Sequence, residues 1–143
     1  MIKKVVTGKD FNGNDYTEEY YFHLTTGDLI DWAAEDGGLV DKITNIAKTD
    51  DPLKIIPMMK KILIRSYGVK TPDGHGFIKD PDTVKNFQYS AAFSELYTEL
   101  STNSDKAVEF IEGILPEFDE ETKKRIDEAK KQYESVLDEA DKE

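Results

Sequence analysis

The chain contains no cysteine, and its 143 residues include only two histidines, His23 and His75. The absence of cysteine excludes a disulfide framework and any thiolate nucleophile, and it is compatible with a cytosolic location. A zinc cluster is excluded as well, because two separated histidines do not supply its ligands. We therefore expect neither a metal nor another cofactor.

Long hydrophobic runs are also missing. No window approaches the roughly 18 apolar residues that a membrane span requires, and the N-terminal sequence MIKKVVTGKD lacks the apolar core of a signal peptide. We therefore expect a soluble intracellular protein that does not bind membranes. A length of 143 residues suits one domain with a core of its own and is too short for two.

Positive charge is scarce relative to negative charge. The chain has 19 lysines and arginines against 30 aspartates and glutamates, which gives a net charge of −11 at pH 7. This surplus of acid disfavours binding to nucleic acid through phosphate contacts. A basic or neutral protein partner is expected instead.

Residues 2–24 have the pattern of a β-hairpin. β-branched and aromatic residues, which suit a pleated surface, lie on both sides of a polar segment. Within this segment Asn12-Gly13 supplies the positive φ of a tight turn.

The same turn partly resembles a calcium-binding loop. Asp10, Asn12 and Asn14 match the first three ligand positions of such a loop. The match then fails, because Asp15 replaces the required glycine, Tyr21 replaces the bidentate glutamate, and the flanks read as strands. An ordinary polar turn is the favoured interpretation.

Helical spacing of apolar residues begins after the hairpin. Thr25 to Asp28 resembles a capping box with aspartate in place of glutamate, which predicts a helix start. Gly37-Gly38 predicts the end of this helix, and a second helix is expected over residues 39–47.

A third helix is predicted from Pro52 to Tyr67, the most apolar segment of the chain. Asp51 serves as its N-cap, and Pro57 in its second turn predicts a kink. Because only a narrow stripe is polar, we expect a central, buried helix. Met58-Met59 is either an adaptable partner surface or core, and core filling is favoured.

Residues 69–76, VKTPDGHG, predict a turn-rich loop, and Asp80-Pro81 predicts the start of the next helix. His75 in this loop is a conceivable catalytic base. No serine, cysteine or second histidine lies at motif distance from it, so we expect no catalytic site and no enzyme. His23 is expected at a packed or surface position of a strand.

Residues 87–116 carry the clearest pattern, two short amphipathic helices joined by a polar turn. Ser90 either caps the first helix or lies within a continuous one, Asn103 or Ser104 caps the second, and Pro116 ends it. For any single apolar position, core packing is the favoured interpretation. The functional hypothesis is that the stripe is partly open to a partner. Its candidate partner-binding residues are Phe93, Leu96, Tyr97, Phe110, Ile111, Ile114 and Leu115.

After Pro116 the composition shifts, with 11 acidic and 6 basic side chains in residues 117–143. Ile126 begins a short apolar seam, which predicts a largely solvated helix that frays toward its end. The predicted fold class is therefore mainly α: a hairpin over 2–24, a compact bundle of five to six short helices over 26–115 and a long charged C-terminal helix. The predicted domain division is a globular unit, 1–116, and an acidic helical or partly disordered tail, 117–143.

Three segments resemble the tail assembly chaperones of long-tailed, siphovirus-type phages or prophages of Gram-positive bacteria. They are DFNGNDYTEEYYFHLT, KKILIRSYG and FIKDPDTVKNFQYSAAFSELYTELSTNSDKAVEFIEGILP. The resemblance covers about residues 2–116. It implies a protein of the host bacterial cytoplasm that binds the tape measure protein, keeps it soluble and helps the tail tube to assemble. Contact with the tail tube protein and a longer frameshifted product are further implications of the resemblance. Self-association through the apolar stripe of residues 87–116 is a separate hypothesis.

Two other function classes remain open. An acidic protein that mimics nucleic acid and binds a basic partner would need carboxylates spaced like phosphates, whereas here they alternate with lysine and arginine. A structural tail component would need more β-structure than one hairpin supplies.

Overall fold

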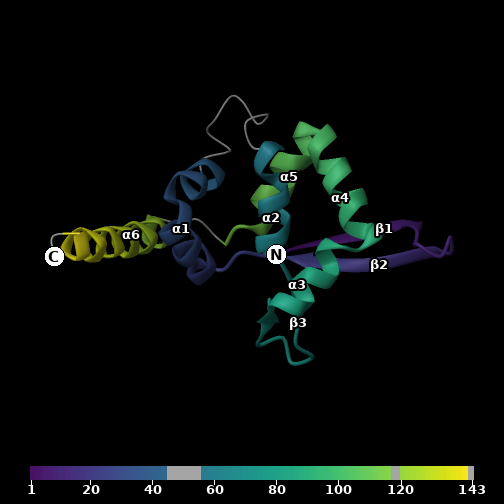
Figure 1. Ribbon diagram of the computed structural model, residues 1–143, viewed down its shortest axis with the longest axis horizontal. Coiled ribbons are helices and arrows are strands. Elements are labelled where there is room, and N and C mark those ends of the chain that lie inside the picture. Colours follow the sequence, from purple (N-terminus) through teal and green to yellow (C-terminus); the bar gives the residue numbers. More distant parts are fainter. Residues whose placement is uncertain (45–55, 117–119, 142–143) are drawn as a thin grey trace.

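The structure is a computed structural model that describes residues 1–44, 56–116 and 120–141; for residues 36–44, 130 and 133–141 it describes the backbone alone. The described elements are a four-stranded antiparallel sheet in the order β1-β2-β3-β4, helices α1 to α6 and one 3₁₀ turn, η3. Helices α2, α4 and α5 lie on one side of the β1–β2 hairpin, and α6 lies at the opposite end of the long axis from the hairpin tip (Figure 1).

The predicted hairpin is confirmed as strands β1 (Ile2–Lys9) and β2 (Asp15–Phe22). Gly13 adopts a φ of 82° in the turn, as the Asn-Gly signal predicts. The Asp10 carboxylate accepts hydrogen bonds of 2.9 Å from the backbone N–H groups of both Asn12 and Asn14. These bonds are those of a polar turn, the interpretation favoured over a calcium loop.

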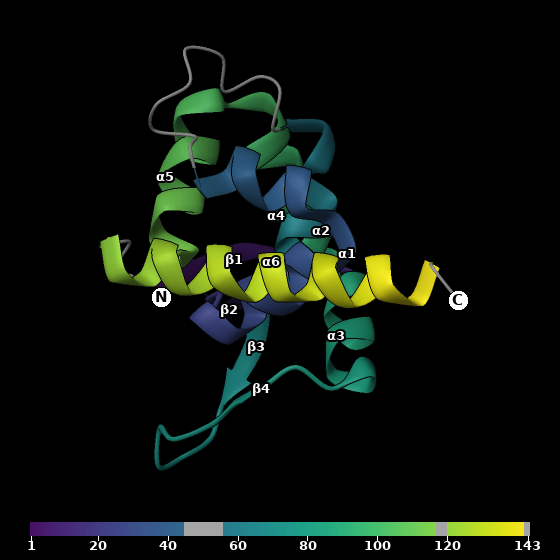
Figure 2. The ribbon, with the colours of Figure 1, turned by 90° about the vertical axis from the view of Figure 1, so that its left-hand side faces the viewer.

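Two further strands, β3 (Tyr67–Lys70) and β4 (Phe77–Ile78), were not predicted. β3 pairs with β2 at Phe22 and Tyr67, and β4 pairs with β3, so the expected loop is the tip of a second hairpin. Local pattern misses these strands because they are short and form only against β2, a segment about 45 residues earlier in the chain. Figure 2 shows that this hairpin points away from α4 and α5.

Helix α1 (Thr26–Thr44) begins at the predicted capping box. The Thr25 hydroxyl accepts a bond from the Asp28 N–H at 3.0 Å, and the Asp28 carboxylate accepts one from the Thr25 N–H at 2.9 Å. The predicted end at Gly37-Gly38 is wrong, because α1 continues through both glycines. A glycine costs only about 1 kcal/mol in a helix interior, which other contacts of a helix can offset. The predicted break at residues 49–51 lies outside the described residues.

The predicted third helix is shorter than expected. Its start at Asp51-Pro52 lies outside the described residues, and Pro57 sits in η3 (Ile56–Met58), before α2 (Met59–Ser66) begins. Proline lacks an N–H and suits a turn that precedes a helix, so no kink arises within α2. The helix ends at Ser66 because Tyr67 already pairs with Phe22 in the sheet. Met59 is fully buried, as core filling requires.

The three following helices begin at predicted caps. Asp80 caps α3 (Pro81–Gln88), Ser90 caps α4 (Ala91–Thr102) and Asn103 caps α5 (Ser104–Ile114). Each cap side chain accepts a bond from the backbone N–H three residues later. Ser90 therefore separates two helices rather than lying within one.

The core lies between the hairpin and the helices. α4 and α5 contact β1, α3 contacts β3, and α2 contacts α4. Phe22 on β2 is fully buried and packs against the rings of Tyr67, Phe87 and Phe110 at centroid distances of 5.2 to 5.9 Å. Such tilted and edge-on ring contacts add to the burial of apolar area.

The last helix, α6 (Glu120–Asp141), contacts α1, and its Ile126 side chain is only 6% exposed. The predicted fold class is therefore wrong. The helices are not a bundle that follows a lone hairpin: they cover a four-stranded sheet, which makes the fold α+β. α6 contacts α1 and buries Ile126, while other described side chains on it, such as Lys124 and Arg125, are exposed. The division into residues 1–116 and 117–143 stays a prediction.

Candidate partner-binding cleft

A cleft of about 540 Å³ lies where the N-terminal part of α1, the C-terminal part of α2 and helix α3 meet. We call it the α3 cleft. Both apolar and charged side chains line it, and the full set is Leu24, Asp28, Asp31, Ile64, Arg65, Lys79, Pro81, Val84, Lys85, Gln88 and Tyr89.

Lys79 links the elements around the cleft. Its ammonium donates hydrogen bonds to the carbonyl oxygens of Arg65 at 2.7 Å and His23 at 2.8 Å, and to the Asp28 carboxylate at 3.1 Å. One side chain thus ties the end of β2, the first turn of α1 and the last turn of α2 to the segment that precedes α3. The Arg65 carbonyl lies in the last turn of α2, where carbonyl groups lack partners within the helix, so the bond from Lys79 satisfies it.

The surroundings of this cluster shift two pKa values. Burial lowers the pKa of the Lys79 ammonium, and the Asp28 carboxylate opposes this effect. Burial by itself raises the pKa of Asp28, but hydrogen bonds from Thr25 and the charge of Lys79 outweigh it, so the pKa is lowered overall. The ammonium of Lys79 and the carboxylate of Asp28 lie 3.1 Å apart and form a half-buried ion pair.

Arg65 forms a second charged group at the cleft. Its guanidinium lies 5.3 Å from the centre of the Trp32 ring, contacts the Glu35 carboxylate and approaches Asp31 at 3.8 Å. Trp32 itself is only 3% exposed. The arginine therefore covers the buried indole and faces the cleft with its charge already balanced.

The rim contributed by α3 and its C-cap is open to solvent. Tyr89 is 69% exposed, and among the aromatic residues whose side chains the structure describes only Phe11 at the hairpin tip is more exposed. Val84 is half-buried and Lys85 is exposed on the same helix. A surface that combines apolar and aromatic groups with neighbouring charged groups can bind one face of an amphipathic segment.

The structure places the sequence-predicted partner-binding residues in the core. Phe110, Ile111 and Ile114 are fully buried, and Leu96 is 2% exposed. Phe93 is 8% exposed, and Tyr97 and Leu115 are partly buried against the same core. The seven residues come together as one packed group, none belongs to the α3 cleft, and their role in partner binding stays a prediction.

The two histidines lie apart from one another. His75 is 88% exposed in the β3–β4 turn, with its Nδ1 3.7 Å from the Asp73 carboxylate. His23 follows β2, and burial lowers the pKa of its imidazole. Within the described part of the chain, no group of three or more histidine, aspartate and glutamate side chains is placed to hold a metal ion.

Sequence reasoning missed the cluster of Lys79 and Arg65. Lys79 bonds to residues 14, 51 and 56 positions away, so no local spacing relates them. The only usable signal is the position of Lys79 directly before an Asp-Pro helix start, which places it at a corner between two elements.

The fold and the cleft together define an α+β protein whose candidate site is a cleft with apolar and charged walls. A model of the phage tail assembly chaperone family matches residues 1–143, the whole chain. The chain therefore belongs to the phage tail assembly chaperone family. No curated protein and no solved structure was found to match it. No described helix is both long and apolar enough to span a membrane.

Proposed function

We propose that this protein binds the tape measure protein of a siphovirus-type phage or prophage in the cytoplasm of a Gram-positive host, keeps that protein soluble and helps the tail tube to assemble. Membership of the tail assembly chaperone family supports the proposal. The observation that carries it is the α3 cleft, which has an exposed aromatic rim at Tyr89 and no catalytic constellation among its lining residues.

The client segment in the cleft is an amphipathic helix. Its apolar face packs on Val84 and Tyr89, and a carboxylate on its flank reaches Lys85, a lysine with no ion pair to any described residue. The net charge of −11 keeps the complex dispersed by repulsion between copies. A nucleic-acid mimic would instead present a continuous surface of carboxylates, whereas at the cleft Asp28, Asp31 and Glu35 all face cations of the same chain.

The proposal is tested by expressing the tape measure protein with and without this chain and measuring its soluble fraction. Wild type is expected to keep the client soluble and to co-purify with it. Tyr89→Ala is expected to weaken binding roughly tenfold or more, as loss of an aromatic anchor does. Phe11→Ala is the matched control, because Phe11 is an exposed aromatic residue outside the cleft.

Two results would overturn parts of the proposal. A client that stays equally soluble without the chaperone would refute the function. A client that is released by Phe11→Ala and retained by Tyr89→Ala would refute the site and leave the function standing.

A further inference from the structure

Strand β1 is an outer strand of the sheet and pairs with β2 alone. The hairpin is closed by a bond from the Asp10 N–H to the Asn14 carbonyl, which sets the alternation of the ladder. Hydrogen-bonded and non-hydrogen-bonded pairs alternate along the ladder, so the N–H and C=O groups of every second residue from Lys3 to Lys9 point away from β2. Four residues of β1 thus offer both backbone groups to another strand.

The exposed edge lacks the usual protection against strand pairing. It contains no proline, and Val5 at its centre is 56% exposed. Edge lysines are one common protection, but Lys3 and Lys9 already pair with Glu19 and Asp15 of their own hairpin, at 3.5 and 2.8 Å. An edge of eight residues with an apolar centre is a surface for strand addition.

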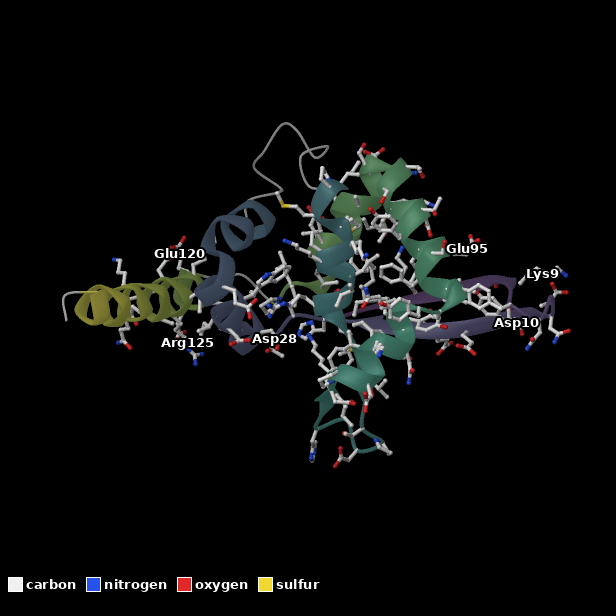
Figure 3. The ribbon with its side chains drawn as sticks, in the orientation of Figure 1. Lys9, Asp10, Asp28, Glu95, Glu120 and Arg125 are labelled. Atoms are coloured by element: carbon white, nitrogen blue, oxygen red, sulfur yellow. The ribbon has the colours of Figure 1, made fainter. Side chains whose placement is uncertain are left out.

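A groove of about 300 Å³ runs along the same edge, between residues 5–7 of β1 and helix α4. Glu95 and Glu99 of α4 line it, and Figure 3 shows Glu95 on α4 above the hairpin. Lys106 pairs with Glu99 at 2.9 Å, whereas Glu95 forms no ion pair with any residue that the structure describes. The groove therefore suits an added strand that carries a cation on its helix-facing side.

β1 itself carries such a cation. Ile2, Lys4 and Val6 alternate toward the helices, and Lys4 forms no ion pair within the described part of the chain. The β1 edge thus combines unpaired backbone groups, the acidic side chain of Glu95 in the groove and the unpaired cation of Lys4. It is therefore complementary to a second copy of itself.

We propose that two copies of this chain pair through antiparallel β1 strands, with Val5 of one copy opposite Val5 of the other. In this register the outward-pointing backbone groups of the two valines bond to each other, and residues 2–8 of both strands are paired. Lys4 of each copy lies opposite Val6 of the other, at the groove that Glu95 lines. The result is one continuous sheet across a two-fold axis.

Neighbouring registers are less favourable. Because side chains alternate between the two faces of a sheet, one strand can slide along the other only in steps of two residues without exchanging the faces. One shift places Val5 opposite Thr7, so that the exposed valines no longer cover each other, and the other places Lys4 opposite Lys4. Like charges directly opposite each other destabilise a strand pair. The Val5 register avoids both and covers the exposed valines.

Because the chain has no cysteine, a single introduced thiol reports the register directly. Val5→Cys is expected to give a covalent dimer on mild oxidation or with a short bismaleimide, since paired Cα atoms lie about 5.5 Å apart. Asn86→Cys is the matched control, because it is exposed on helix α3, outside the sheet. Equal cross-linking of the two variants would indicate random collision and would overturn the proposal.

Association without cross-linking is measured by light scattering over a concentration series. Val5→Pro removes an N–H that points out of the sheet, so the fold is expected to persist while association weakens by roughly tenfold or more. Lys4→Glu is expected to weaken the dimer, and addition of Glu95→Lys to restore it. A wild-type chain that is monomeric throughout, or a dimer insensitive to Val5→Pro in a variant that melts like wild type, would overturn the proposal. Capture of a client strand by the edge, with no self-association, would overturn it as well.

Discussion

The Lys79 ammonium donates a hydrogen bond of 2.7 Å to the carbonyl oxygen of Arg65 and so joins the last turn of α2 to the segment that leads into α3. The same ammonium satisfies the His23 carbonyl and the Asp28 carboxylate. Three acceptors from separate elements therefore depend on one side chain. Lys79 therefore holds together the three elements that form the candidate site.

Lys79→Met is expected to lower the free energy of unfolding by about 2 kcal/mol, because it leaves half-buried acceptors without a donor. Urea denaturation at pH 7 measures the loss. Lys85→Met, a lysine that is exposed on the neighbouring helix, is the control and should change stability by less than about 0.5 kcal/mol. Equal effects of the two substitutions would show that the Lys79 bonds contribute nothing specific.

His23 predicts a dependence of stability on pH. Burial lowers the pKa of its imidazole below the value of about 6.5 that an unfolded chain has. Between the two pKa values the unfolded chain binds more protons, so the free energy of unfolding falls as the pH drops below about 6.5 and is fully retained above it.

Unfolding measured from pH 8 to pH 5 is expected to show this loss in wild type and in His75→Gln, since the His75 side chain is exposed. His23→Asn is expected to flatten this part of the profile. A profile that keeps its slope in His23→Asn would assign the pH dependence to other groups.

Gly68 is required by a close approach within the β3–β4 hairpin. A Cβ atom at this position would lie 2.7 Å from the Phe77 ring, closer than real contacts allow. Gly68→Ala is therefore expected to destabilise the protein by about 1 to 3 kcal/mol through displacement of the ring. Gly27→Ala is the matched control, because the added atom would meet nothing nearer than 3.7 Å. Thermal melts of both variants test the difference.

The predicted partner-binding stripe can be tested against its placement in the core. Phe110 is fully buried, with its ring centre 5.2 Å from that of Phe22, so Phe110→Ala is expected to cost about 3 to 5 kcal/mol of stability. Circular dichroism during urea unfolding provides the measurement. A variant that keeps its stability and loses the tape measure protein would instead support the stripe as a client surface.

Much of the local structure was predictable because its signals act over a few residues. The Asn-Gly turn, the Thr25–Asp28 capping box and the caps at Asp80 and Ser90 all depend on hydrogen bonds between residues at most four positions apart. Such bonds form wherever the local sequence permits them, so a pattern of residue types is enough to locate them. The resemblance to the family could also be recognised from the sequence, because the segments that carry it contain the Asn-Gly turn and the caps at Asp80 and Ser90.

The fold class and the site were not predictable in this way. Tyr67 reads as the last residue of an apolar helix, and it becomes a strand residue because Phe22 pairs with it. Gly37-Gly38 reads as a helix end, yet α1 continues through it. In both places interactions with the rest of the fold outweigh a local secondary-structure propensity of about 1 kcal/mol.

The sequence by itself determined the hairpin, the starts of four helices, the acidic character and the tail assembly chaperone resemblance. Only the tertiary structure decided that the apolar stripe of α4 and α5 is core, that β1 is an open edge and that Lys79 meets Arg65, His23 and Asp28. The physical reason is distance along the chain. Caps and turns are settled by neighbours, whereas burial, sheet order and the charged cluster depend on segments that become neighbours only when the chain folds.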